Sequence, residues 1–186
     1  MKYKFIWLCV LALSISCVLE LARPSTSLEN FNQLVHPEDA ASYVGSGFDQ
    51  LSAFSFKVPD FPRTDSKARE ILKKNIIPTA VRELSGQKIV IQGYMFPLKI
   101  SEGKVTQFII LKDQSWCCYG KIPEINEWVV ARSDIGFKPV LDVPINFYGK
   151  FKVGEQFDEN DYLVGIYQME CSSIGPLFPA DIGTRK

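Results

Sequence analysis

Residues 143–153 read Val-Pro-Ile-Asn-Phe-Tyr-Gly-Lys-Phe-Lys-Val and carry the clearest strand pattern in the chain. Apolar residues and one glycine occupy every second position, and the positions between them are mostly polar. Alternation of this kind is typical of a half-buried β-strand. Because proline cannot donate a ladder hydrogen bond, Pro144 indicates that this segment begins at a sheet edge or at the start of its strand.

Four more stretches predict strands on either side of this segment. The first begins at Gln87, where Ile89, Ile91 and Met95 alternate with more polar neighbours, and Gly93 inside it favours the tight coiling that small barrels need. A hairpin turn at residues 99–104 leads to the other three, at 105–112, 127–132 and 162–170. The chain is therefore predicted to be mostly β, with a small five-stranded barrel like that of oligonucleotide/oligosaccharide-binding (OB) domains. A small β-sandwich is the alternative.

One or two short helices are expected before the barrel. Asp65 or Ser66 can cap a helix that ends in Lys73 and Lys74. Pro78 suits the first position of a second short helix, and Gly86 suits its exit. We expect residues 63–186 to form a helical lead-in plus the β-barrel domain, and residues 23–62 to be an irregular tether and packing segment.

The first 22 residues have the pattern of an export signal. Lys2 and Lys4 precede an apolar run at residues 5–19, and this run is short for a membrane span, which needs about 20 apolar residues. Cys17 is the lipidation candidate. Cleavage, lipidation and retention as an anchor stay open, so the expected location is the periplasm or the membrane-anchored cell envelope.

The charge balance argues against a nucleic-acid partner. The 186-residue chain holds 21 Lys and Arg and 21 Asp and Glu, so it has no overall attraction to a polyanion.

The five cysteines leave several hypotheses open. Two of them precede residue 23, which leaves Cys117, Cys118 and Cys171 for an oxidising compartment. At most one internal disulfide can form, between Cys171 and either Cys117 or Cys118. The alternatives are a Zn or Cu site made by the three thiols, a redox-active pair at Cys117 and Cys118, and reduced cysteines that only pack. No other cofactor is expected.

Aromatic residues surround the cysteine pair. Trp116 and Tyr119 flank it, Trp128 opens the next strand, and these three are the candidates for a ligand-binding surface. The single histidine, His36, lies far from the predicted barrel. No catalytic residues are therefore predicted, and a non-enzymatic role is favoured.

Several short motifs occur in a fixed order from residue 76 to residue 174. They are Gly-Tyr-Met-Phe-Pro-Leu at 93–98, Cys-Cys-Tyr-Gly at 117–120, Asn-Glu-Trp-Val at 126–129 and Tyr-Leu-Val-Gly-Ile-Tyr at 162–167. In this order they resemble the bacterial family catalogued as domain of unknown function 3299. The resemblance implies a secreted or lipid-anchored envelope protein, in a family often encoded beside transporter permeases, and brings no established catalytic residues.

These observations predict an exported envelope module with a binding or accessory role. Its expected partner is a membrane transporter complex or another envelope protein, and its N-terminal segment would attach it to the membrane. A thiol-dependent metal-handling or redox protein that uses the Cys117-Cys118 loop is one alternative. An OB-like oligosaccharide binder is another.

Overall fold

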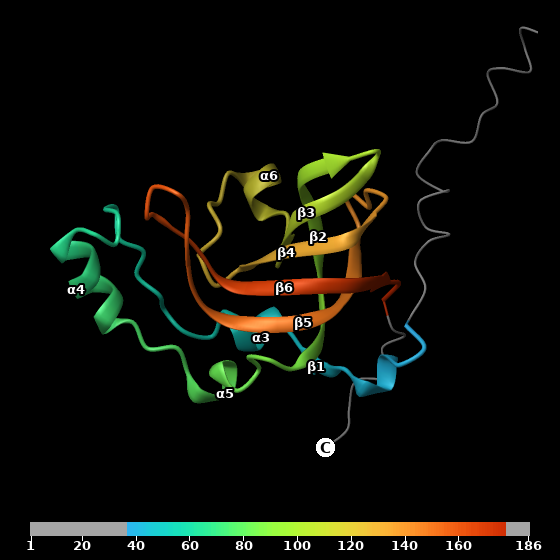
Figure 1. The fold of residues 1–186 in the computed structure, drawn as a ribbon, viewed down its shortest axis with the longest axis horizontal. Helices are drawn as coiled ribbons and strands as arrows, with labels where there is room; N and C mark the ends of the chain where they lie inside the picture. Colours follow the sequence, from blue (N-terminus) through green and yellow to red (C-terminus); the bar gives the residue numbers. More distant parts are fainter. Residues whose placement is uncertain (1–36, 178–186) are drawn as a thin grey trace, which may run out of the picture.

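A computed structural model describes residues 37–177 and shows a mostly β protein (Figure 1). Five strands form a closed barrel, and a sixth strand is added to it. The barrel strands are β2 (Lys88–Ser101), β3 (Lys104–Leu111), β4 (Trp128–Phe137), β5 (Pro144–Phe157) and β6 (Leu163–Gly175). The extra strand, β1 (Val44–Ser46), pairs in parallel with β2. The predicted signal at 1–22, Cys17 and the first part of the tether lie outside the described residues.

The strand order identifies the kind of barrel. The sheet runs β1-β2-β3-β4-β6-β5, and β2 also pairs with β5, which closes it. The sequence-consecutive pairs β2–β3, β3–β4 and β5–β6 are antiparallel, whereas β6 lies parallel to β4. This is the Greek-key connectivity of an OB barrel, so the predicted OB-like barrel is confirmed and the sandwich alternative is wrong.

Two glycines allow the strands to approach closely where the barrel closes. A Cβ atom on Gly93 would lie 2.6 Å from Ile110 Cγ2 and 2.7 Å from the Leu111 carbonyl oxygen. A Cβ on Gly149 would meet the Glu170 backbone and would lie 2.7 Å from Met169 Cγ. The expected tight coiling at Gly93 is therefore present, and Gly149 has the same role in β5. Pro144 is the first residue of β5, as expected for a residue that has no N–H to donate to a strand ladder.

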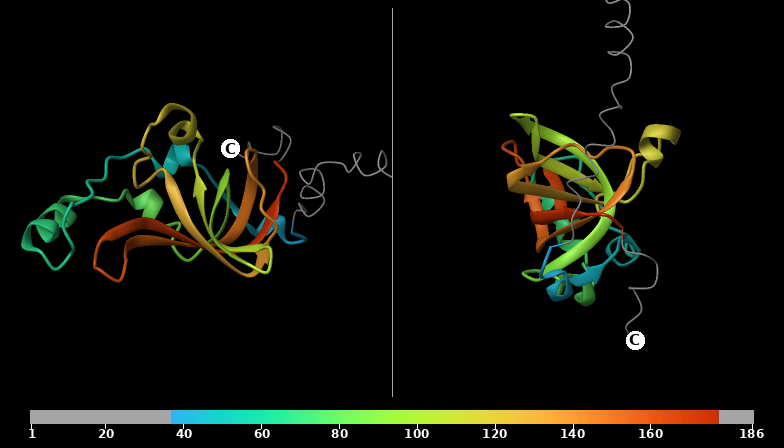
Figure 2. Two further views of the ribbon diagram at one scale, coloured as in Figure 1. Left: turned by 90° about the horizontal axis from the view of Figure 1, so that it is seen from above. Right: turned by 90° about the vertical axis from the view of Figure 1, so that its right-hand side faces the viewer.

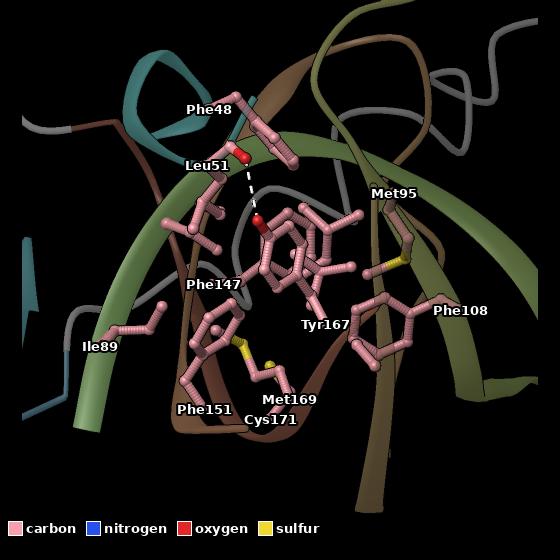
Figure 3. Packing of buried hydrophobic residues seen from close by; sticks show 14 of the residues in the cluster. Phe48, Leu51, Ile89, Met95, Phe108, Phe147, Phe151, Tyr167, Met169 and Cys171 are labelled. Atoms are coloured by element: carbon pink, nitrogen blue, oxygen red, sulfur yellow. Dashed lines mark hydrogen bonds between the residues drawn. The ribbon is translucent and has the colours of Figure 1, made fainter. Parts of the chain in front are cut away.

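The core fills the inside of the barrel with large apolar side chains (Figure 3). Helix α3 (Phe48–Leu51) packs Phe48 and Leu51 onto this core. The hydroxyl of the buried Tyr167 donates a hydrogen bond to the Leu51 carbonyl oxygen at 2.8 Å (Figure 3). The Tyr167 ring stacks on Phe151, with ring centroids 5.5 Å apart. Burial raises the pKa of Tyr167 well above its usual range, so the hydroxyl keeps its proton and remains a donor.

The remaining helical segments are short and lie outside the barrel. They are η2 (Ala40–Ser42), α4 (Ser66–Lys74), α5 (Thr79–Arg82) and α6 (Ser115–Tyr119). Asp65 caps α4 by accepting a hydrogen bond from the Lys67 backbone at 2.7 Å, as predicted. Helix α4 stands off to one side of the barrel (Figures 1 and 2), and Arg63, just before it, binds Asp161 of the β5–β6 turn at 2.6 Å. From residue 37 to residue 177, no helix is long and apolar enough to span a bilayer.

Tyr167→Phe tests the link between α3 and the barrel. We expect a loss of roughly 1–3 kcal/mol in the free energy of unfolding, because the Leu51 carbonyl is left buried without its donor. Tyr162→Phe is the matched control, since Tyr162 is 43% exposed. Urea unfolding measures both variants. Equal stability of the two variants would show that the Leu51 hydrogen bond contributes nothing.

Candidate functional site

A broad concave feature of the described residues lies where β4 and β6 separate. These strands pair only at residues 130–132 and 168–170. Beyond this point a groove of about 830 Å³ opens between them, and we call it the seam groove. Its lining residues are Tyr43, Gly86, Lys88, Arg132, Ser133, Asp134, Ile135, Lys150, Glu170, Cys171 and Ser172.

A wide bulge in β4 keeps the seam open. In the β3–β4 register, Gln107 faces Arg132 whereas Val105 faces Phe137, so two steps along β3 correspond to five along β4. Residues 133–136 therefore form a bulge that is in register with neither β3 nor β6 among the described strands. Gly136 has a φ of +63°, and a Cβ there would lie 2.9 Å from Lys104 Cβ, so glycine suits this turn of the backbone. Bulges bend a strand away from its partner and are common beside functional sites.

Four charged side chains form a row across the outer face of the barrel at the groove. Arg132 faces Glu170, Glu170 faces Lys150, and Lys150 faces Lys88 on successive strands. Lys88 binds Asp39 at 2.9 Å and lies 5.4 Å from the centre of the Tyr43 ring. No ion pair is found for Arg132 or Lys150 within residues 37–177. Since Lys150 directly opposes another lysine, the β5 side of the groove is suited to a negatively charged group, whereas Asp134 adds an acidic side chain on the β4 side.

Polar groups also lie at one side of the groove and beneath it. The Tyr43 and Ser172 hydroxyls share a hydrogen bond of 3.1 Å, and the Tyr43 ring meets Tyr148 edge-on at 5.2 Å. Ser133 is buried, and its Oγ has no hydrogen-bond partner among the described residues. Such an orphaned hydroxyl marks a place where the local structure is not optimised for stability alone.

Cys171 also lines the groove, and its buried thiol forms no disulfide within the described side chains. Its Sγ donates to the Ser173 carbonyl oxygen at 3.3 Å. Burial raises the pKa of this thiol to about 12, so it is protonated at neutral pH and is a weak nucleophile and metal ligand in this setting.

The side chains of Cys117 and Cys118 are outside what the structure describes, although their backbone belongs to α6. The disulfide of Cys171 with either of them, and the Zn or Cu site of all three, therefore stay predictions. Among the described side chains, no group of three or more metal-binding residues was found.

The three predicted aromatic ligand-surface residues do not line the groove. Trp116 meets Phe96 edge-on, with ring centroids 5.2 Å apart, and Tyr119 is 86% exposed at the end of α6. Trp128 is half-buried and packs against the core. All three therefore stay candidates for a separate ligand surface, and Trp128 also packs against the core.

The loop that carries α6 is anchored by Glu127. This buried carboxylate accepts hydrogen bonds from Lys112 Nζ at 2.9 Å and from the Glu124 backbone N–H at 3.1 Å, and Lys121 Nζ lies 3.5 Å away. Burial alone would raise the pKa of Glu127, but the Lys112 hydrogen bond, the Glu124 hydrogen bond and the two lysine charges outweigh it and lower the pKa. Both ends of the loop are therefore held by one ionised group.

Comparison with known proteins identifies a fold relative. A crystal structure of a DUF3299 family protein from Pseudomonas aeruginosa PAO1 is similar to this chain, with a TM-score of 0.51 and 24% sequence identity. The two chains share one fold. The match covers 74% of this chain and 97% of the other, and it supports the DUF3299-like relationship that the sequence motifs indicate. No family model and no curated protein sequence matches the chain.

Glu127→Gln tests the anchor of the α6 loop. Because the folded carboxyl has a pKa below its ordinary value of 4.5, its contribution is fully present above that value and is lost as the pH falls through the lower folded value. We expect Glu127→Gln to cost roughly 1–3 kcal/mol at pH 7 and progressively less below pH ~4.5. Urea unfolding at pH 7 and pH 3 measures this difference. The exposed Glu124→Gln is the control, and an equal cost at both pH values would contradict the assigned role of Glu127.

Proposed function

We propose that this protein is an exported binding or accessory module of the cell envelope, and that the seam groove is its binding surface. The observation that carries the proposal is the groove itself, which is about 830 Å³ and holds Arg132 and Lys150 in a row of charges on paired strands. Pockets of roughly 300–1,000 Å³ with a few fixed polar groups are typical of ligand sites.

The positions of these groups support recognition. Arg132, Glu170 and Lys150 belong to hydrogen-bonded strands, so their backbones are held by the closed barrel. Sites on strands position their side chains more firmly than sites on loops. A fold alone does not fix a function, and the DUF3299 relative is described by a family of unknown function, so the proposal rests on the groove and on the N-terminal sequence.

Export and membrane attachment are supported by residues 1–22. Two lysines followed by an apolar run at residues 5–19 form an export signal, and Cys17 offers a lipidation point. The role beside a transporter complex is supported by the resemblance to a family often encoded beside permeases.

Deleting residues 2–22 tests export. We expect the full chain in the envelope fraction of a bacterial host and the shortened chain in the cytoplasm, because the receptor for the signal reads this segment. Fractionation and immunoblotting measure the distribution. In parallel, Cys17→Ser removes the lipidation point, so a lipidated protein should lose its incorporation of a labelled fatty acid, whereas a retained anchor carries no label with or without the change. Export of the shortened chain would contradict the proposal.

Site-specific photocross-linking in cells tests the groove as a binding surface. A benzophenone side chain at Ile135, which is 63% exposed in the groove, is expected to give a discrete adduct with an envelope component. The same side chain at Ile122, which is 86% exposed outside the groove, is the position control. Lys150→Glu should reduce the Ile135 adduct, whereas Lys99→Glu, a charge change outside the groove, should not. Adducts of equal strength at both positions would contradict the proposal.

A further inference from the structure

We propose that the seam groove binds an extended segment of a partner polypeptide, which is added as a strand between the β4 bulge and the second half of β6. An acidic side chain of this segment is held by Arg132 and Lys150. The inference rests on the proposed function and names the ligand class for the same site.

The two strands at the seam are not paired with each other beyond Arg132 and Glu170 in the described chain. Residues 171–175 of β6 pair with β5 on one edge, and no pairing with β4 follows Glu170 in the described chain. Residues 133–136 of β4 pair with neither neighbour in the described registers. Unpaired strand edges present backbone N–H and C=O groups, which a further strand can pair with.

The groove is lined by the edges of two strands. The lining contains consecutive residues, 132–135 from β4 and 170–172 from β6. Successive side chains of a strand point to opposite faces, so a lining of consecutive residues means that the strand edges themselves form the walls. An extended polypeptide repeats its donors and acceptors about every 3.3 Å per residue and therefore matches such walls. Neither a phosphate nor a glycan has backbone-like donors and acceptors that repeat at this spacing.

The length of the unpaired edges limits the length of the added strand. Because residues 132–137 face only two steps of β3, the bulge spans roughly 7 Å, which corresponds to about two residues of an added strand. Five residues of β6 run beyond its last pair with β4, so the second wall is long enough for the same segment. Short edge strands of this size are used for peptide recognition because backbone pairing supplies affinity while side-chain contacts supply specificity.

The positive charges of Arg132 and Lys150 favour an acidic segment. Arg132 and Lys150 both face Glu170 in register, one from each side, and neither has an ion pair within residues 37–177. A guanidinium binds a carboxylate in two parallel hydrogen bonds. A carboxylate placed near Lys150 also relieves the repulsion from Lys88, which faces it on β2. The exposed Ile135 offers an apolar contact, so the geometry favours acidic residues alternating with apolar ones.

A capped octapeptide of four Val-Glu repeats is the probe, and the protein is the full-length chain purified from the envelope fraction. Fluorescence anisotropy with the labelled probe measures affinity, and hydrogen exchange locates the binding. We expect saturable binding with slower exchange at residues 133–136 and 171–175. A probe with methylated nitrogens at alternate residues keeps its charge but loses the donors for one edge, so it should bind at least about tenfold more weakly.

Variants test the charge contacts. Arg132→Glu and Lys150→Glu should each weaken binding of the Val-Glu probe by about tenfold or more and should improve binding of a Val-Lys probe. Lys99→Glu is the control of equal charge change and should leave both affinities unchanged. Unchanged thermal unfolding of the three variants confirms that the fold is intact.

The outcomes separate this inference from the proposed function. Equal binding of the methylated and unmethylated probes would overturn strand addition while leaving the groove as an anion-binding site. Absence of Val-Glu binding, with the Ile135 cross-link retained, would overturn the polypeptide ligand and not the binding module. If the protein is a dimer in sedimentation experiments and the probe dissociates this dimer, the occupant of the groove is a second copy of the chain. That result would overturn the proposal of a different partner polypeptide.

Discussion

The antiparallel pairing of β2 with β5 is the constraint on which the barrel depends. Residues 88–94 of β2 pair with residues 144–150 of β5, so the sheet has to curve back on itself. Gly93 and Gly149 lie within this pairing, and their missing side chains leave room for the backbone of the neighbouring strands. Once the sheet is closed, its inner face can bury the aromatic core, and α3 can pack onto that core through Phe48 and Leu51.

In the closed sheet, the irregular pairing lies between β4 and β6. β4 and β6 pair over only three residues each, and the bulge at 133–136 takes the rest of β4 away from β6. Parallel pairing is slightly less stable per residue than antiparallel pairing, so the seam is the place where opening the barrel costs least. The seam groove is therefore a consequence of how this barrel closes, with charged residues of the outer face along its sides.

Local patterns in the sequence predict much of the fold. The alternation at 143–153 and the Asp65 cap are signals carried by neighbouring residues, and both appear in the structure. Strand β1 and helix α3 were not predicted, since β1 has three residues and is defined by its pairing with β2, more than 40 positions away. The sequence predicts that this strand ends at Arg132, but β4 continues to Phe137, because the bulge breaks the period-two pattern after Arg132.

The candidate site could not be predicted in the same way. Arg132, Lys150 and Glu170 are ordinary outward positions of three strands when the sequence is read alone, and only the register brings them into one row. The sequence instead favours Trp116, Tyr119 and Trp128 as ligand-surface residues, and none of the three lines the groove. One signal was available: after Val129 and Ala131, the inward position holds the polar Ser133, and Gly136 follows.

The route by which the chain reaches the barrel has a geometric consequence. Asp39 binds Lys88, and Tyr43 contributes to the groove lining, so the polypeptide leading from the N-terminus arrives beside the groove. Residues 23–36 can extend at most on the order of 50 Å. With the proposed attachment at the membrane, this length limits the distance between the groove and the bilayer. It therefore favours partners that are embedded in the same bilayer or held close to it.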